Sequence, residues 1–104
     1  MGVRDGSALV LYEFTLKPEM AEQAEAMMGE LLPGTRSYDG CLDLTLYRDA
    51  ADPLSYTIVM HWTTHDRFRQ YREWRAADMS GTFDAWPSFL SSGPAIRLLE
   101  ATGM

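Results

Sequence analysis

The sequence predicts an α+β domain in which two helices cover one face of a four-stranded antiparallel sheet. Segments rich in β-forming residues alternate with segments of helical periodicity in the order β-α-β-β-α-β. The two middle strands are separated by a loop short enough for a hairpin. With 104 residues, 46% of them apolar, the chain suits one globular domain over residues 1–104, of which residues 1–7 are expected to be flexible.

The first strand is expected from Ala8 to Leu16, where side chains alternate between two faces. A helix should follow, because Pro18 suits a first helical turn and the acidic residues after it complement the helix dipole. Apolar residues then recur at helical spacing as far as Leu32. The Pro-Gly pair at residues 33–34 is expected to end this helix.

The second strand is expected from Cys41 to Arg48, after a turn at residues 38–40. The third is expected from Leu54 to Trp62, and the loop between the two strands contains Asp52-Pro53. Two strands joined in this way should pair as a hairpin.

The second helix is expected from His65 to Met79, with Thr64 as its N-cap. Ser80-Gly81 should break it. A short helix from Thr82 to Leu90 and a fourth strand from Ala95 to Ala101 are expected to complete the domain. Together the elements describe a ferredoxin-like sandwich with both main helices on one side of the sheet.

The sheet is expected to be apolar on both faces. Large apolar side chains point to both faces of the first and third strands: Leu9, Leu11 and Val59 lie on one face, and other large apolar residues lie on the other. No remaining element can cover the second face, so a second copy of the sheet is expected to do so, which gives a two-fold homodimer. His61 should lie at this interface, although its titration near neutral pH also makes it a candidate base.

The charge balance restricts the class of partner. Fifteen acidic and nine basic residues give a net charge of −6, which disfavours nucleic acid and anionic membranes. No apolar run approaches the roughly 20 residues that cross a bilayer. Four arginines share the second helix with acidic residues and are interpreted as a solvated, salt-bridged face: Arg67, Arg69, Arg72 and Arg75.

The sequence offers no recognisable cofactor or metal site. Cys41 is the single cysteine, which excludes an intramolecular disulfide and favours a reducing, cytoplasmic location. It lacks an evident base and is not expected to act as a nucleophile. His61 and His65 are separated by a strand end, so the helical metal-binding geometry is not available.

The junction between the third strand and the second helix is the expected functional site. A strand that passes so directly into a helix should bring Trp62, Phe68 and Tyr71 together over the sheet. Tyr71 could orient a substrate hydroxyl or relay a proton, and Trp62 could form an aromatic wall, so these two are the catalytic candidates. The alternative is that both are core residues.

Further residues are expected to line a cavity of roughly 300 Å³ or more between the sheet and the second helix. The substrate-binding candidates are mostly large and apolar: Tyr12, Phe14, Met60, Phe68, Trp74, Trp86 and Arg97. Methionine would adapt to a bulky ligand, and Arg97 could steer an acidic or phenolate group. Packing in the core, or exposure at a sheet edge for Arg97, is the alternative.

Four short motifs in a fixed order resemble the antibiotic biosynthesis monooxygenase family: Lys17-Pro18, Arg36 before Gly40-Cys41, Asp52-Pro53, and Trp62. The resemblance covers the chain from about Leu9 to Leu99 and implies a dimeric α/β barrel. It also implies a cofactor-independent monooxygenase that uses dioxygen on a phenolic or aromatic polyketide-type small molecule. The alternatives are a polyketide cyclase or isomerase of the same fold, and a non-catalytic ligand-binding dimer.

The sequence departs from the family pattern at several positions. Met60 stands where members commonly have Glu, and Ile58 stands where some have Asn. Haem-degrading relatives have Asn at the position of Tyr12 and a His farther along, whereas no His follows His65 here. Haem chemistry is therefore not expected, and the choice between oxygenase, cyclase and binding protein stays open.

Overall fold

The computed structural model describes residues 8–77 and 81–104. The elements follow one another as β1 (Ala8–Leu16), η1 (Pro18–Met20), α1 (Ala21–Ser37), β2 (Cys41–Arg48), β3 (Ser55–Trp62), α2 (His65–Ala76), η2 (Thr82–Phe89) and β4 (Leu90–Glu100), where η marks a 3₁₀-helix. The expected flexible start at residues 1–7 and the expected end of the second helix at Met79 lie outside the described residues.

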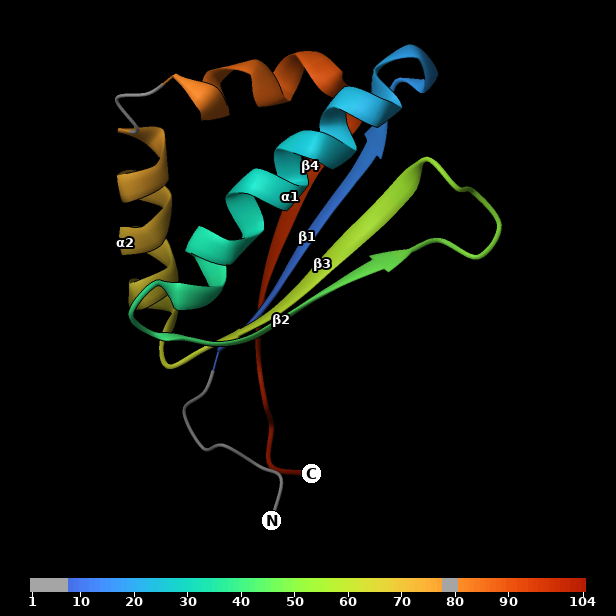
Figure 1. The fold of residues 1–104 in the computed structure, drawn as a ribbon. Coiled ribbons are helices and arrows are strands. Elements are labelled where there is room, and N and C mark those ends of the chain that lie inside the picture. Colours follow the sequence, from blue (N-terminus) through green and yellow to red (C-terminus); the bar gives the residue numbers. More distant parts are fainter. Residues whose placement is uncertain (1–7, 78–80) are drawn as a thin grey trace.

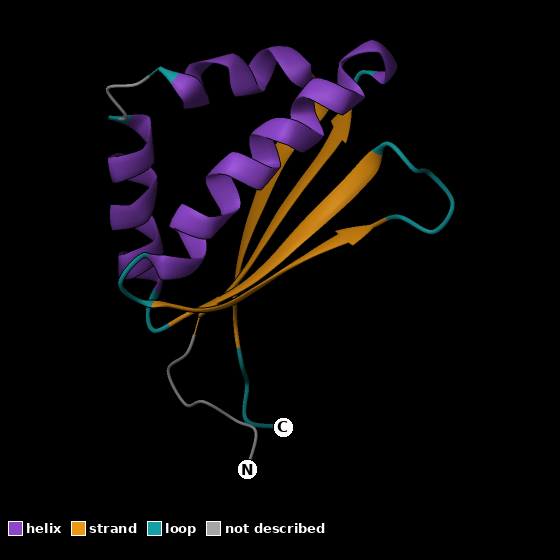
Figure 2. Cartoon of the chain, viewed as in Figure 1, coloured by secondary structure: helices purple, strands orange, loops and turns teal. Residues whose placement is uncertain are grey.

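The four strands form one antiparallel sheet in the order β2-β3-β1-β4. β1 and β3 lie at its centre and pair from Ala8 opposite Trp62 to Thr15 opposite Ser55. α1 crosses in front of the strands in Figure 1, and the helical segments all lie on one side of the sheet in Figure 2. The predicted ferredoxin-like α+β fold is confirmed.

The face of the sheet that packs against the helices, called the covered face below, holds the core. Strand alternation places the even-numbered side chains of β1 and β3 on this face, and most of them are buried. The largest side chains that are fully buried are Trp62, Leu16 and Val10. α1 adds Ala24 and Met28 to the same core.

The opposite face, called the open face below, is apolar at its centre, as the sequence predicted. Leu9 and Leu11 on β1 alternate with the core residues, and Val59 lies opposite Leu11 on β3. His61 lies opposite Leu9 on the same face. All four side chains are only partly buried within a single copy of the chain.

α1 continues through Pro33, although the sequence predicted that the helix would end just before it. Contacts from α2 hold the last turn: Arg75 donates a hydrogen bond to the Leu31 carbonyl oxygen at 3.0 Å, and Thr35 is buried. Tertiary contacts therefore outweigh the helix-breaking tendency of proline at this position. At the other end, the predicted first turn at Pro18 is the separate 3₁₀-helix η1.

β4 begins at Leu90, earlier than the predicted start at Ala95. Residues 93–94, Gly-Pro, were expected to precede the strand but lie inside it, where its pairing with β1 shifts in register. Gly93 has φ 89°, and a Cβ there would lie 2.6 Å from the Glu13 carbonyl oxygen. Only glycine lets the two strands pass this closely, so the glycine shapes the strand instead of breaking it.

Candidate functional site

A cavity of about 280 Å³ lies between the covered face of the sheet and the helices, slightly below the expected size. α1 forms one wall with Met28, Leu31 and Leu32, and η2 forms another with Phe83 and Trp86. Leu44 of β2 and the β3 side chains discussed below form the floor. The lining of the cavity is mainly apolar and suits a small ring system.

Five of the nine predicted site residues line this cavity. Tyr12 and Met60 reach it from the sheet, Phe68 and Tyr71 from α2, and Trp86 from η2. They come from four separate elements, so the fold brings together residues that the sequence places up to 74 positions apart. Their roles in binding or catalysis stay predictions.

The other four predicted residues do not line the cavity. Trp62 and Phe14 are core residues beneath it, at 0% and 3% exposed. Trp74 is 48% exposed, and its ring packs beside that of Tyr38, with the centroids 5.2 Å apart. Arg97 is opposite Leu11 on the open face of the sheet, so its expected role in steering a ligand into this cavity is wrong.

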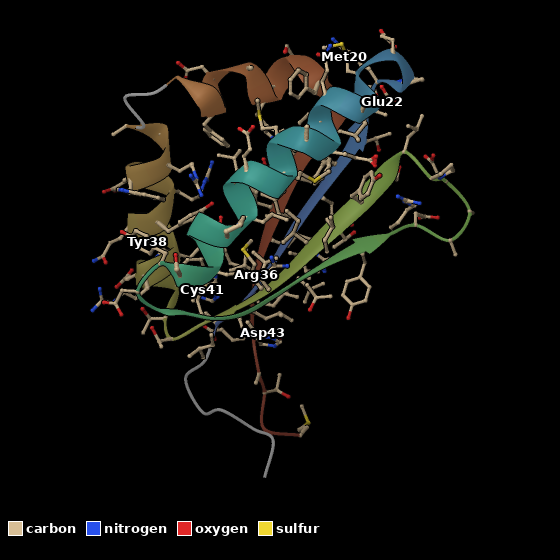
Figure 3. The ribbon with its side chains drawn as sticks, in the orientation of Figure 1. Met20, Glu22, Arg36, Tyr38, Cys41 and Asp43 are labelled. Carbon is tan, nitrogen blue, oxygen red and sulfur yellow. The ribbon has the colours of Figure 1, made fainter. Side chains whose placement is uncertain are left out.

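The predicted meeting of Trp62, Phe68 and Tyr71 is confirmed. The Trp62 ring centroid lies 5.7 Å from that of Phe68 and 5.3 Å from that of Tyr71. Tyr38, at the turn between α1 and β2 in Figure 3, extends the cluster with a ring 5.4 Å from Tyr71. Trp62 therefore supports the cavity wall from behind, and its buried indole N–H has no hydrogen-bond partner among the described residues.

One end of the cavity is polar. We call the side chains of Thr35, Tyr71 and Arg75 the polar corner. The Tyr71 hydroxyl and Thr35 Oγ1 are 2.6 Å apart, and Arg75 donates to both oxygens, at 3.3 and 3.1 Å. α1 supplies the threonine and α2 the other two, so this network also fastens the helices together.

Arg75 is one of the cavity-lining polar residues that sequence reasoning missed, together with Thr35 and Arg72. It was assigned to a solvated face of the second helix, but it is only 8% exposed and it lines the cavity. Arg67 and Arg69 do lie on the outside, where they pair with Asp39 and Asp66. The available signal was spacing, because Arg75 follows Tyr71 by four residues and so shares its helix face.

Tyr12 supplies a second phenol to the cavity. Its oxygen accepts a hydrogen bond of 3.0 Å from the Trp86 indole N–H. Burial raises the pKa of the Tyr12 phenol above its ordinary value, and the Trp86 hydrogen bond and the Arg72 charge oppose that rise. The hydroxyl is therefore neutral at physiological pH and keeps a proton that it can donate.

Other chemical groups lie apart from the cavity. Burial raises the pKa of the Cys41 thiol, which weakens it as a nucleophile. His61 Nδ1 lies 3.7 Å from a carboxylate oxygen of Asp43 on the open face. Within residues 8–77 and 81–104, no group of three or more acidic, His or Cys side chains is placed to hold a metal ion, and no helix is long and apolar enough to span a membrane.

Solved structures share this fold over nearly the whole chain. A conserved protein from Methanosarcina mazei Go1 is 18% identical, with a TM-score of 0.80 over 92% of this chain and 93% of its own. Rv0793 from Mycobacterium tuberculosis is 17% identical, with a TM-score of 0.77 over 91% and 94%. A point mutant of SnoaB, described as a cofactor-independent oxygenase from Streptomyces nogalater, is 22% identical, with a TM-score of 0.74 over 93% and 94%.

Sequence comparison gives the family. A search of curated protein sequences finds no match. The sequence model for antibiotic biosynthesis monooxygenases, however, matches residues 7–79, which include β1, α1, β2, β3 and α2. These elements carry the floor of the cavity, the polar corner and the Trp62 cluster, so the matched segment contains most of the candidate site. The chain belongs to the antibiotic biosynthesis monooxygenase family.

Proposed function

We propose that the protein is a cofactor-independent monooxygenase that acts on a small phenolic or aromatic polyketide-type molecule in the cytoplasm. The observation that carries the proposal is an apolar cavity with the hydroxyls of Tyr71 and Tyr12 in its lining. An aromatic ring would pack against its apolar walls, and the two hydroxyls would orient the polar substituents of that ring. Family membership and the description of SnoaB as a cofactor-independent oxygenase support the same activity.

The proposed reaction needs no electrons from the protein. An ionised phenol transfers an electron to dioxygen, the two radicals combine at a ring carbon, and the resulting hydroperoxide loses water to give a quinone. One oxygen atom enters the product, and the other leaves as water with the hydrogens of the ring C–H and the phenol O–H. The protein orients the substrate and, with the substrate filling the cavity, keeps water from the reactive intermediates, which suits the apolar walls.

A second candidate is a cyclase or isomerase that acts on a similar substrate. Met60 and Ile58 occupy the positions where family members commonly have Glu and some have Asn, and both line the cavity as apolar surface. Tyr71 or Tyr12 would then hold an enolate oxygen without consumption of dioxygen. A non-catalytic ligand-binding dimer is the third candidate.

The proposal includes a homodimer formed through the open face. A second sheet packed against Leu9, Leu11 and Val59 would remove these partly exposed apolar side chains from water. It would also close the two sheets into the barrel that the family resemblance implied.

Oxygen uptake with an anthrone tests the proposed activity. With chelator present and no added flavin, 1,8-dihydroxyanthrone should be oxidised with consumption of dioxygen. Tyr71→Phe should reduce turnover by about a hundredfold, because the variant keeps the ring but loses a positioned hydroxyl. Tyr47→Phe is the matched control, since Tyr47 is 56% exposed on β2. If the substrate is converted at the same rate under nitrogen as in air, that result would contradict the oxygenase and favour the cyclase or isomerase.

A further inference from the structure

Arg75 is a buried cation whose contacts with the described residues are with neutral groups. Its guanidinium donates to the Tyr71 hydroxyl, the Thr35 hydroxyl and the Leu31 carbonyl oxygen. It also lies over the Trp74 ring at 4.7 Å. Among the described residues no carboxylate forms an ion pair with it, and a buried charge is costly unless an opposite charge compensates it.

The charge around the cavity differs from the charge of the whole chain. The chain carries a net charge of −6, yet Arg72 and Arg75 line the cavity and no Asp or Glu is among the described residues that line it. The field of Arg72 reaches the interior, because it lowers the pKa of Tyr12. The lining is therefore complementary to an anion, and its mainly apolar surface strengthens such an attraction.

We infer that the polar corner is an oxyanion site, which binds an ionised oxygen of an aromatic ligand through the Arg75 guanidinium and the Tyr71 hydroxyl. A phenolate or an aromatic carboxylate has the matching charge, and its ring would extend along the apolar walls. The inference rests on the proposed function in one respect, that the ligand occupies this cavity. It adds the charge state of the ligand and the residue that selects it.

The inference also accounts for deprotonation at a site without a general base. No His, Asp or Glu is among the described residues that line the cavity. A fixed positive charge lowers the pKa of a bound phenol, so the proton leaves to solvent as the ligand binds. The phenolate formed in this way is the electron-rich species that the proposed oxygenation needs.

A pair of ligands of the same shape tests the oxyanion site in the unmodified protein. 2-Naphthoate carries a negative charge, and 2-naphthamide is its neutral counterpart. Calorimetry should give a dissociation constant at least about tenfold lower for the naphthoate, as expected for charge-assisted hydrogen bonds. For the phenolate, absorbance titration should give 2-naphthol a lower pKa when bound than when free.

Substitutions then assign the preference to one residue. Arg75→Met should bring the two ligands to within about twofold of each other and abolish the pKa shift of bound 2-naphthol. Arg69→Met removes the same charge from the exposed side of α2 and should keep both effects. Arg75→Lys should keep part of the preference, because the charge remains but the planar fork is lost.

The outcomes separate this inference from the proposed function. Equal binding of naphthoate and naphthamide to the unmodified protein would overturn the oxyanion site and leave the cavity as a neutral binding site. A preference retained in Arg75→Met, with thermal unfolding showing a folded protein, would overturn the assignment to Arg75. If Arg75→Met does not fold, the relative affinities for naphthoate and naphthamide in the unmodified protein and in Arg75→Lys still test the oxyanion site. Failure of both ligands to bind would overturn the ligand-binding cavity together with the proposed function.

Discussion

Both faces of the sheet carry large apolar side chains on β1 and β3, but the covered face carries many more of them and only it packs against helices. On the covered face, Val10 and Phe14 are buried beneath helices, and a partly open cavity lies between the helices and the sheet. On the open face, Leu9 and Leu11 alternate with them along the same strand, and no helix lies on that side in Figure 2. Apolar side chains on both faces of one strand therefore do not by themselves separate the face proposed to bind a ligand from the face proposed to serve assembly. The helices make that distinction, because they cover one face and supply the polar corner of the cavity.

The largest expected effect is on the covered face. Phe14→Ala should lower the free energy of unfolding by about 3–5 kcal/mol, because it removes a ring packed against Tyr56 and Trp86 and leaves a void. Urea denaturation measures the change. Tyr47→Ala, which removes an exposed ring from β2, should stay within about 0.5 kcal/mol. Equal losses in the two variants would contradict the division between core and surface.

A charge on the open face should prevent the proposed dimer from forming. Val59→Asp would bury a carboxylate at the proposed interface, so the dimer should dissociate at micromolar concentration, with a cost of several kcal/mol. Light scattering reports the mass, which for one copy is 11.8 kDa. Gln23→Asp, on an exposed position of α1 on the other side of the sheet, is the control and should stay dimeric. A monomer in the unmodified protein would remove the proposed role of the open face.

A smaller effect is expected where β3 passes into α2. The Thr64 hydroxyl accepts a hydrogen bond from the Arg67 backbone N–H at 3.1 Å and caps the helix. Thr64→Ala should lower the free energy of unfolding by about 1 kcal/mol, whereas Thr64→Ser should restore most of it. Thermal unfolding of the three proteins provides the measurement. No loss in the alanine variant would show that helix packing, not the cap, fixes this junction.

The smallest effect is a pH dependence that comes from the cavity. Because the pKa of Tyr12 is higher in the folded chain than in the unfolded chain, its contribution to stability is complete below about pH 10 and declines as the pH rises through the folded pKa. Replacing Tyr12 with Phe should make the unfolding temperature fall less steeply on the alkaline side. Parallel curves for the two proteins would contradict the raised pKa.

Much of the fold follows from the sequence because strand alternation and helix caps are local signals. The alternation in β1 and β3 identified both apolar faces, and Thr64 located the start of α2. The extent of α1 and β4 could not be predicted, because contacts distant in the sequence determine both. Arg75 holds the turn after Pro33, and the close approach of Gly93 to β1 keeps that residue within the strand.

The site was predictable in its aromatic residues and not in its charge. Helix spacing placed Phe68 and Tyr71 over the sheet, and the structure confirms that position. Arg75 looked like a member of an exposed basic helix face, because residue type outweighed its spacing from Tyr71. Arg97 was associated with the cavity for its charge, but the register of β4 directs it to the other face.

Isotope labelling tests the central claim, that the cavity supports oxygenation by dioxygen alone, most directly. The protein is incubated with 1,8-dihydroxyanthrone under ¹⁸O₂, with chelator and without flavin, and the quinone product is analysed by mass spectrometry. The account predicts one labelled oxygen atom in the quinone, formed much more slowly by Tyr71→Phe than by the Tyr47→Phe control. A product that contains no label from dioxygen, or equal rates with the two variants, would contradict it.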